Sequence, residues 1–291
     1  MTLPRQQTLR YGENPHQTAA WYSSSCGWGG AHQLQGKELS YNNLLDLDAA
    51  QATVERFPTN EGAAAVVIKH TNPCGVATGR DASDALARAI AADPVSAFGG
   101  IVALNQPLDA AACASLQGLF LECIVAPEIT KEAREILASK SNLRLLELPP
   151  AASAAATRQQ LRSVLGGVLL QERDQAGDDA KAWQVVTQRQ PDAKEWADLR
   201  FAWRVVRHVR SNAIVVAKAG QSLGVGAGQM NRVGSAGIAL DAAGEEARGA
   251  VLASDGFFPF DDTVKLAAER GIRAVIPVSY THLTLPTTVS V

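Results

Sequence analysis

The sequence predicts an α/β fold, and three observations lead to that prediction. Short apolar runs of strand length alternate with segments of helical periodicity along most of the chain. Apolar residues make up 46% of the 291 residues and charged residues 19%, which is ordinary for a globular protein. No apolar run approaches the ~20 residues that a membrane-spanning helix needs. At this length we expect two modest α/β domains that share an interface, divided near residue 160.

The first half alternates strands with helices. We expect strands at residues 63–68, 100–104, 121–125 and 143–148, and helices at residues 84–92 and 131–138. Thr130 can cap the second helix, and Glu132 and Glu135 lie near its positive N-terminal end. Residues 149–157, with Pro149-Pro150 and an Ala/Ser run, are typical of a domain boundary or a surface connection.

The second half contains the clearest helix signal. Gly166-Gly167 opens a strand that we expect to reach Leu170. Asp192 and Glu195 have the spacing of a capping box. An apolar stripe with helical spacing follows them, which indicates core packing for its two tryptophans: Trp196, Leu199, Trp203 and Val206. We expect further strands at residues 214–217, 223–225 and 251–254, and a helix at residues 235–243.

The last stretch of the chain behaves differently. Residues 277–291 read PVSYTHLTLPTTVSV and include no charged side chain. The stretch neither continues nor closes the α/β alternation. We therefore expect residues 277–291 to be a non-native tail in place of the native C-terminus.

Charge and cysteine content restrict the class of protein. Basic and acidic residues nearly balance, 27 against 29, so nothing supports a nucleic-acid or an acidic-membrane partner. A small anionic ligand needs only a few local positive groups. The four cysteines include no C-x-x-C pair, so we expect reduced thiols rather than disulfides or a structural zinc site: Cys26, Cys74, Cys113 and Cys123. The first ten residues lack a signal-peptide run, and we expect a cytoplasmic location.

The segment KHTNPCG, residues 69–75, combines chemistry with a strand exit. A histidine can take a proton at neutral pH, and a neighbouring ammonium favours the neutral imidazole and can stabilise developing negative charge. Lys69 and His70 can serve one site only if the strand ends there, because consecutive strand residues point to opposite faces. Pro73 supports such an ending and Gly75 permits a tight turn. From these residues alone, a structural histidine beside a solvated lysine stays an equal alternative.

Other loops have a similar character. Arg10 opens a polar turn and could hold a phosphate, and residues 96–100 could bring backbone N–H groups to a ligand. Residues 224–232 form a Gly-rich turn that ends in a cation, but their spacing does not match a dinucleotide-binding fingerprint. Residues 255–260 place three phenylalanines beside an aspartate, where they either pack in the core or line a flat ligand.

The pattern of a zinc deaminase is incomplete. Such an enzyme shows His-x-Glu and Pro-Cys-x-x-Cys. Here His70 is followed by Thr71-Asn72, and Pro73-Cys74 lacks the second cysteine. We therefore expect no metal.

Seven loop segments stand out together. They read RYGENPHQ (10–17), KELSYNNLLDLDAA (37–50), KHTNPCG (69–75), DPVSAFGG (93–100), SNAIVVAK (211–218), GAGQMNR (226–232) and SDGFFPF (254–260). In this order, from about residue 8 to residue 276, they closely resemble the AICAR transformylase family. That enzyme is the formyl-transferring part of a bifunctional purine-biosynthesis protein.

The resemblance implies a reaction and an architecture. The reaction is transfer of a formyl group from 10-formyltetrahydrofolate, a co-substrate, to the 5-amino group of aminoimidazole carboxamide ribonucleotide (AICAR). The fold implied is two cytidine-deaminase-like α/β units in tandem without zinc, here residues 1–160 and an incomplete unit at 161–276. Active sites in the family lie at the interface of a homodimer.

The resemblance also implies roles for individual residues. His70 would be the general base and Lys69 would stabilise the oxyanion or assist the folate leaving group, with Asn212 and Lys218 assisting at the reacting centre. The remaining residues would bind the substrates, Asp262 near the pterin and Arg232 near the phosphate: Arg10, Tyr11, Phe98, Gly99, Glu122, Arg232, Phe257 and Asp262.

Three departures from the family pattern accompany the resemblance. We expect this chain to lack the cyclohydrolase domain that usually precedes this part. The Gln-Pro-Gly-Gly-Ser turn that usually follows Ala274-Val275-Ile276 is replaced by the uncharged tail, so C-terminal ligand contacts would be lost. Asp261 stands where an arginine is common, which we treat as tolerated variation. Besides the formyltransferase, two hypotheses therefore stay open: a nucleotide-binding fragment without turnover, and a deaminase-like metalloenzyme.

Overall fold

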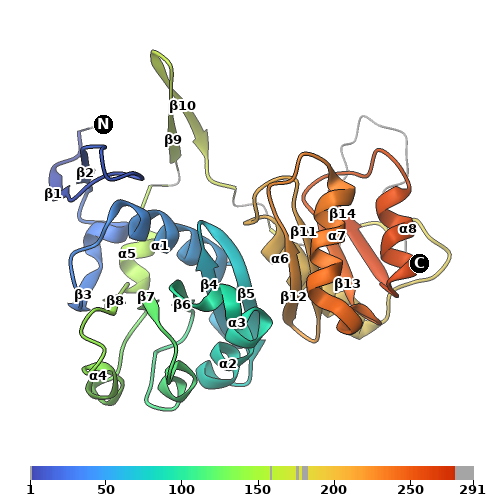
Figure 1. The fold of residues 1–291 in the computed structure, drawn as a ribbon, viewed down its shortest axis with the longest axis horizontal. Helices are drawn as coiled ribbons and strands as arrows, with labels where there is room; N and C mark the ends of the chain where they lie inside the picture. Colours follow the sequence, from blue (N-terminus) through green and yellow to red (C-terminus); the bar gives the residue numbers. More distant parts are fainter. Residues whose placement is uncertain (1, 158, 175–176, 179–182, 279–291) are drawn as a thin grey trace.

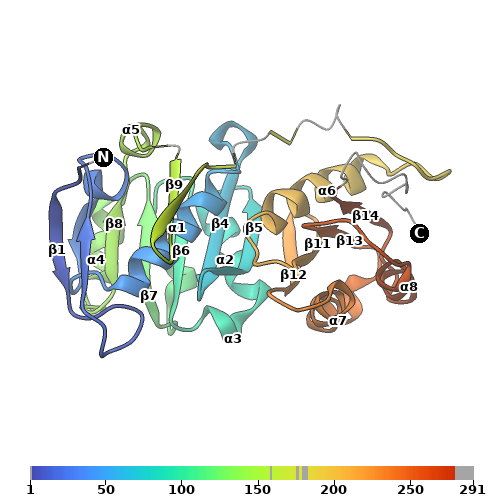
Figure 2. The same ribbon diagram turned by 90° about the horizontal axis from the view of Figure 1, so that it is seen from above.

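The computed structural model describes residues 2–157, 159–174, 177–178 and 183–278. It confirms the α/β class. A mixed ten-stranded sheet runs through the molecule in the order β14-β13-β11-β12-β5-β4-β6-β7-β8-β3, with helices on both faces (Figures 1 and 2).

The same order of elements occurs twice along the chain. The first series is α1 (Tyr41–Val54), β4 (Ala63–Lys69), β5 (Asn72–Gly79), α2 (Ala82–Ala92), β6 (Gly100–Leu104) and β7 (Leu121–Ala126). The second series is α6 (Ala193–Val206), β11 (Ile214–Lys218), β12 (Gln221–Gly226), α7 (Arg232–Ala243), β13 (Val251–Ser254) and β14 (Ala274–Pro277), with α8 (Asp262–Glu269) before its last strand.

Strand directions repeat as well. β4 is antiparallel to β5 and β6, and β6 is parallel to β7. In the second series β11 is antiparallel to β12 and β13, and β13 is parallel to β14. The two series meet where β12 pairs antiparallel with β5, at Gln221 and Ala77.

The remaining elements flank this framework. They are β1 (Arg5–Leu9), β2 (Ala19–Tyr22), β3 (His32–Gln35), α3 (Pro94–Ala97), α4 (Lys131–Leu137), β8 (Arg144–Glu147), α5 (Pro150–Ala154), β9 (Gln159–Val164) and β10 (Gly167–Glu172). β1 and β2 form a small sheet of their own, and β9 and β10 form a hairpin that projects from the molecule (Figure 1).

Two apolar layers cover the sheet. On one face α1 and α6 share a core with strand residues such as Val66 and Val215. On the other face α2 packs over Val67 and its neighbours, whereas α7 and α8 pack over Val216 and its neighbours. Alternate strand residues point to opposite faces, so these fully buried strands are apolar throughout.

Local signals explain the helix starts. Ser40 and Asn43 form a capping box at α1, and Asp192 and Glu195 form the predicted one at α6. The Thr130 hydroxyl accepts from the Ala133 N–H, which confirms the predicted cap of α4.

The structure confirms most of the predicted elements and corrects several. Gly75 is not a turn residue. It lies inside β5, where a Cβ would come within 2.0 Å of the Ala89 oxygen of α2, so glycine allows close helix packing. The stretch 149–157 contains the short helix α5, and the strand opened by Gly167 pairs with β9, which was not predicted. Pro277 ends β14, whereas residues 279–291 of the predicted tail lie outside the described residues.

Candidate active site

Lys69 and His70 lie where β4 turns back into β5. Lys69 pairs with Asn72, so His70 and Thr71 alone form the turn, with φ angles of 51° and 62°. Positive φ at both central residues is the geometry of tight hairpin turns and normally selects asparagine and glycine. A β-branched threonine in this region is a genuine outlier, and such outliers gather at functional sites.

The carboxylate of Asp46, on α1, fixes this turn through a hydrogen bond. Its Oδ1 accepts the Thr71 N–H at 2.6 Å. Burial raises the pKa of Asp46 above its ordinary value, although the backbone hydrogen bond from Thr71 and the charge of His70 act in the opposite direction. The Asp46 carboxyl group therefore fixes the turn and lies close enough to Lys69 and His70 to interact with their charges.

The residues between the end of α3 and the start of β6 complete one side of the site. The Lys69 ammonium donates to the Phe98 carbonyl oxygen, and a Cβ on Gly99 would lie 3.3 Å from Lys69 Nζ. Phe98, 58% exposed, forms a ring pair with Phe120 at 5.4 Å between centroids. The site thus combines a cation with an exposed aromatic surface.

The expected backbone donors of residues 96–100 are mostly engaged. The Ser96 N–H donates to Asp93 at 2.9 Å and the Gly99 N–H donates to the Phe120 oxygen at 2.8 Å. The expectation of free N–H groups is therefore wrong for these two residues. The segment instead presents the Phe98 carbonyl to Lys69.

Glu122 lies on the same sheet edge as Gly99. Gly100 of β6 pairs with Leu121 of the parallel strand β7, which places Glu122 beside it. The Glu122 carboxylate pairs with Arg144 at 2.8 Å. Because β4 is antiparallel to β6 and β7, its carboxyl end meets their amino ends. Of these three strands, only β4 therefore follows the usual rule that ligands gather at the carboxyl ends of strands.

A second cluster forms around the start of β11. Asn212 Nδ2 donates to the Gln229 oxygen at 2.8 Å, and the Ser235 hydroxyl donates to the Asn212 oxygen at 2.8 Å. Arg232, at the start of α7, pairs with Asp255 and donates to Ser254 Oγ at 3.0 Å. The Arg232 side chain is only 14% exposed, and Asp255 neutralises much of its charge inside the protein.

Hydrogen bonds connect the two clusters. Asn72 Nδ2 donates to the His70 oxygen at 3.1 Å, while Asn72 Oδ1 accepts the Arg210 N–H at 3.0 Å. The Gly228 N–H in turn donates to the Arg210 oxygen at 2.7 Å. The His70 turn and the Asn212 loop consequently lie at the same end of the sheet.

Phe257 and Asp262 follow β13 at that end of the second series. Phe257 is partly buried, and Phe258 beside it packs against the core under α7 and α8. Phe260 is 72% exposed, so the three phenylalanines divide between core and surface. Asp262 opens α8, and its carboxylate accepts the Thr263 N–H at 2.6 Å.

Three of the predicted residues lie apart from this arrangement. Arg10 and Tyr11 follow β1 and contact each other, with the guanidinium 5.6 Å from the ring centroid. No hydrogen bond or ion pair between described residues joins them to the His70 turn. Lys218 ends β11 at the opposite edge of the sheet, where its ammonium donates to the Arg248 oxygen at 2.9 Å.

Sequence reasoning missed four residues near the turn. Asp46, Asn72, Phe120 and Arg210 each contact a predicted residue or its loop. Asp46 and Asn72 lie within two of the seven motifs, so the sequence could have identified them. Phe120 and Arg210 carry no local signal, because only the sheet pairing brings them to this edge.

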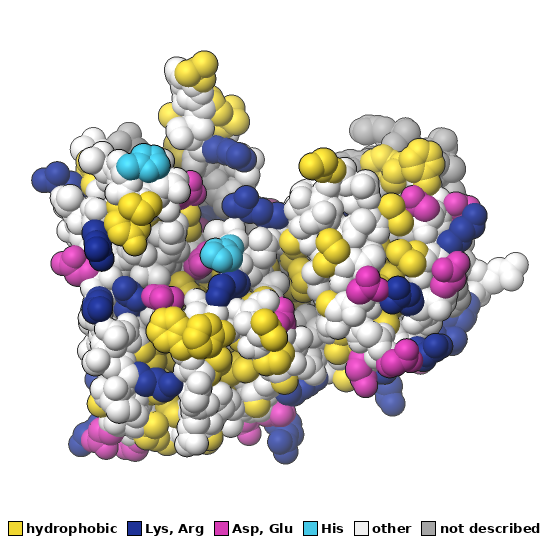
Figure 3. Space-filling model, in the orientation of Figure 1, with side chains coloured by type: hydrophobic (Ala, Val, Ile, Leu, Met, Phe, Trp, Pro, Cys, Tyr) yellow, Lys and Arg dark blue, Asp and Glu magenta, His cyan; other side chains and the backbone are white. Residues whose placement is uncertain are grey.

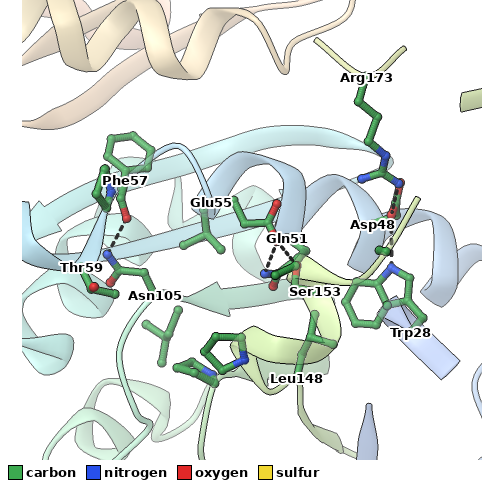
Figure 4. Close-up of a pocket in the computed structure, with 18 of the residues that line it drawn as sticks. Trp28, Asp48, Gln51, Glu55, Phe57, Thr59, Asn105, Leu148, Ser153 and Arg173 are labelled. Carbon is green, nitrogen blue, oxygen red and sulfur yellow. Dashed lines mark hydrogen bonds and ion pairs between the residues drawn. The ribbon is translucent and has the colours of Figure 1, made fainter. Parts of the chain in front are cut away.

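A different cavity lies at the opposite edge, near the carboxyl ends of β6, β7 and β8. It measures about 520 Å³ and includes Trp28, Asn105 and Leu148 in its wall (Figure 4). Asn105 Nδ2 donates to the carbonyl oxygens of Phe57 and Gly62, at 2.9 and 3.0 Å. Its amide donors are thus occupied by the protein itself.

Within the described ranges, no group of three or more His, Cys, Asp or Glu side chains is placed to hold a metal ion. All four cysteines are free thiols, and burial raises the pKa of Cys74, beside the Lys69 strand, to about 12. Among the helices of the described residues, none is long and apolar enough to cross a membrane.

Comparison with known proteins decides the family. A family model described as the AICARFT/IMPCHase bienzyme matches residues 1–242. The chain belongs to the AICARFT/IMPCHase bienzyme family. Six of the seven motifs contribute residues to the end of the sheet that carries Lys69 and His70. Within one chain, Arg10 and Tyr11 of the first motif lie apart, and so does Lys218 of the fifth.

Curated relatives agree with this assignment. The bifunctional purine biosynthesis protein PurH of Synechococcus sp. (strain CC9311) is 67% identical over 282 residues, which cover 94% of this chain and 53% of that protein. The PurH proteins of Prochlorococcus marinus strains MIT 9313 and MIT 9211 are 67% and 59% identical. The chain spans about half the length of the curated relatives it matches.

Proposed function

We propose that this AICARFT/IMPCHase family chain transfers a formyl group from 10-formyltetrahydrofolate to the 5-amino group of AICAR. One observation carries the proposal: Lys69 and His70 occupy a turn with positive φ that Asp46 holds, beside the exposed ring of Phe98. A base, a cation and an aromatic surface at one strand exit are what this reaction requires.

The proposed chemistry balances at these residues. The amine nitrogen attacks the formyl carbon, and His70 takes the proton that the amine loses. Lys69 stabilises the oxyanion of the tetrahedral intermediate. The bond from the formyl carbon to the folate nitrogen then breaks, and the proton held by His70 returns to that leaving nitrogen. Positioning of a weak amine nucleophile contributes several further kcal/mol, on the order of 7–11 in well-oriented systems.

Substrate contacts follow from the two clusters. Phe98, Gly99 and Glu122 border the nucleotide or the folate from the first series, and Asn212 assists at the reacting centre from the second. Phe257 likewise borders the nucleotide or the folate, and Asp262 lies near the pterin. Arg232 approaches the phosphate, although its pairing with Asp255 limits the charge that it offers.

We place the activity in a homodimer of cytoplasmic chains. The β9–β10 hairpin supports this, because every residue in both strands is exposed and one face carries Leu161, Val168 and Leu170. An isolated two-stranded hairpin is at best marginally stable in water, so a second copy that covers the apolar face would stabilise it. The same pairing offers a way for Arg10, Tyr11 and Lys218 to reach a site, since one chain leaves them apart.

The repeated order of elements supports two cytidine-deaminase-like units in tandem. We assign residues 1–160 to the first unit and 161–276 to the second, with a non-native segment at 277–291. No zinc participates in the proposed reaction, because His70 and Cys74 lack the companion residues of a deaminase site.

Formation of tetrahydrofolate from 10-formyltetrahydrofolate and AICAR tests the proposal. We expect turnover that depends on both substrates. A folded chain that binds the nucleotide but forms no tetrahydrofolate would favour the second candidate, a nucleotide-binding chain without catalysis. Stoichiometric zinc in the purified protein would instead favour the metalloenzyme.

A further inference from the structure

A cavity of about 920 Å³ lies between the β9–β10 hairpin, α1 and the loop that precedes β11. Its wall includes three arginines and one acidic residue: Arg162, Arg173, Arg210 and Asp48. None of these four side chains was assigned a role above, although the backbone of Arg210 joins the two clusters. We propose that this arginine cavity binds an anionic group, a phosphate or a carboxylate, of one substrate of the formyl transfer; the inference rests on the proposed function.

The charge balance of the arginine cavity favours an anion. Asp48, the acid, is already engaged, because it pairs with Arg173 at 3.3 Å and accepts from Trp28 Nε1 at 3.2 Å (Figure 4). Among the described residues, Arg162 and Arg210 have no carboxylate partner. Two guanidinium groups therefore face the cavity with their charge uncompensated.

The hairpin lines this cavity with residues from both of its faces, most of them polar: Gln159, Gln160, Leu161, Arg162, Leu169 and Gln171. Residues opposite each other in an antiparallel pair share a face, so Arg162 lies with Leu169, and Gln160 lies with Gln171. These four residues line the cavity, and Gln171 Nε2 donates to Gln160 Oε1 at 3.0 Å. Leu170 and Val168 lie on the other face with Leu161, and of these three only Leu161 lines the cavity.

The arginine cavity is adjacent to the reacting groups. The Arg210 N–H donates to Asn72, which donates to the His70 oxygen, so two hydrogen bonds separate Arg210 from the catalytic turn. Figure 3 shows a histidine and several Lys and Arg side chains gathered on the face below the hairpin. An anion bound here would lie at the end of a substrate whose reactive part reaches His70.

The guanidinium groups of the arginine cavity indicate which class of ligand it binds. Their planar donors match phosphate and carboxylate oxygens in pairs. Both proposed substrates carry such groups, the ribonucleotide as its phosphate and the folate as its glutamate carboxylates. Because Arg232 is already paired with Asp255, the unpaired guanidinium groups of the arginine cavity are the stronger candidates for either anion.

Calorimetric binding to the full chain tests this inference. The probes are AICAR and its ribonucleoside, which lacks the phosphate, and 5-formyltetrahydrofolate and the corresponding pteroate, which lacks the glutamate. The variants are Arg162→Gln and Arg210→Gln, and Arg134→Gln on the exposed side of α4 is the matched control. Losing one charge-assisted contact lowers affinity by about tenfold or more.

If the cavity holds the phosphate, both variants weaken AICAR by about tenfold and leave its ribonucleoside unchanged. If it holds the glutamate, they weaken the folate and spare the pteroate. If the unmodified chain binds both substrates and both variants bind every probe with the affinity of Arg134→Gln, the inference is overturned and the proposed function is not. An unmodified chain that binds neither substrate would overturn the proposed function and this inference with it.

Discussion

At the scale of single residues, the His70 turn shows what the sequence could and could not predict. The motif identified Lys69 and His70 and required the strand to end at them, and β4 does end at Lys69. The two-residue turn itself carried no signal, because histidine and threonine replace the asparagine and glycine that such turns favour. Strand β5 was not predicted because proline inside a segment normally argues against a strand. In the structure Pro73 lies at a register shift between β4 and β5.

The Asp46 contact leads to a prediction about positioning. Replacing Asp46 with alanine removes the acceptor of the Thr71 N–H, so the turn loosens and kcat falls by about tenfold with little change in KM. Asp46→Asn keeps an acceptor oxygen and should restore most of kcat. Steady-state kinetics of both variants checks this. Equal losses in the two variants would assign the effect to charge rather than to positioning.

His208 predicts how stability depends on pH. Burial, with Arg56 and Arg207 nearby, lowers its pKa from 6.5 to about 4. A lowered pKa means that the unfolded chain binds the proton more tightly, so stability is present above pH 6.5 and is lost as the pH falls toward 4. Between pH 7.5 and pH 5 the loss from this residue amounts to about 2 kcal/mol. Urea unfolding of His208→Gln should show a smaller loss over this range; an unchanged pH dependence would contradict the assignment.

At the scale of elements, capped helices and apolar strands were the predictable part. The stripe of α6 and the caps of α4 and α6 follow from local chemistry, and the structure confirms them. The packing of helices onto glycines was not predictable from spacing. In both series a glycine of the second hairpin strand lies under the next helix, Gly75 under α2 and Gly224 under α7.

Gly75→Ala tests this helix–strand packing. The new Cβ would come within 2.0 Å of the Ala89 oxygen, so β5 and α2 must separate and the free energy of unfolding should fall by about 2 kcal/mol. Gly237→Ala, inside α7, is the matched control. A methyl group at Gly237 would meet no neighbouring atom within 4 Å, and helix propensity predicts a gain of roughly 0.5–1 kcal/mol. Urea titration measures both, and equal effects would contradict the packing argument.

At the scale of the whole molecule, one sheet joins two series of elements that repeat each other. The sequence predicted two α/β halves but not their junction, because the pairing of β12 with β5 joins residues far apart in the chain. Lys69 and Lys218 end equivalent strands, and each donates to the carbonyl oxygen just before a glycine with positive φ. Opposite strand directions at the junction put the two lysines on opposite edges. A match to the sequence motifs alone could not show that Lys69 and Lys218 lie at opposite edges of the sheet.

The hairpin carries the prediction about assembly. Leu161 and Leu170 pair on its apolar face, and replacing both with glutamate should shift a dimer toward monomer at micromolar concentration, because charge disfavours burial of that face. Ile136→Glu, on the exposed side of α4, controls for loss of an exposed apolar residue. Sedimentation equilibrium distinguishes the variants. Dimers that persist in the double variant would place the interface elsewhere.

We propose that His70 transfers the proton in the formyl-transfer reaction. The most direct measurement compares the rate of tetrahydrofolate formation and AICAR affinity in the unmodified chain and in His70→Asn. Asparagine tolerates the positive φ of this turn, so it removes the base and keeps the backbone. We predict a fall in turnover of about a hundredfold or more, with nucleotide affinity nearly unchanged. Turnover close to that of the unmodified chain would contradict the account.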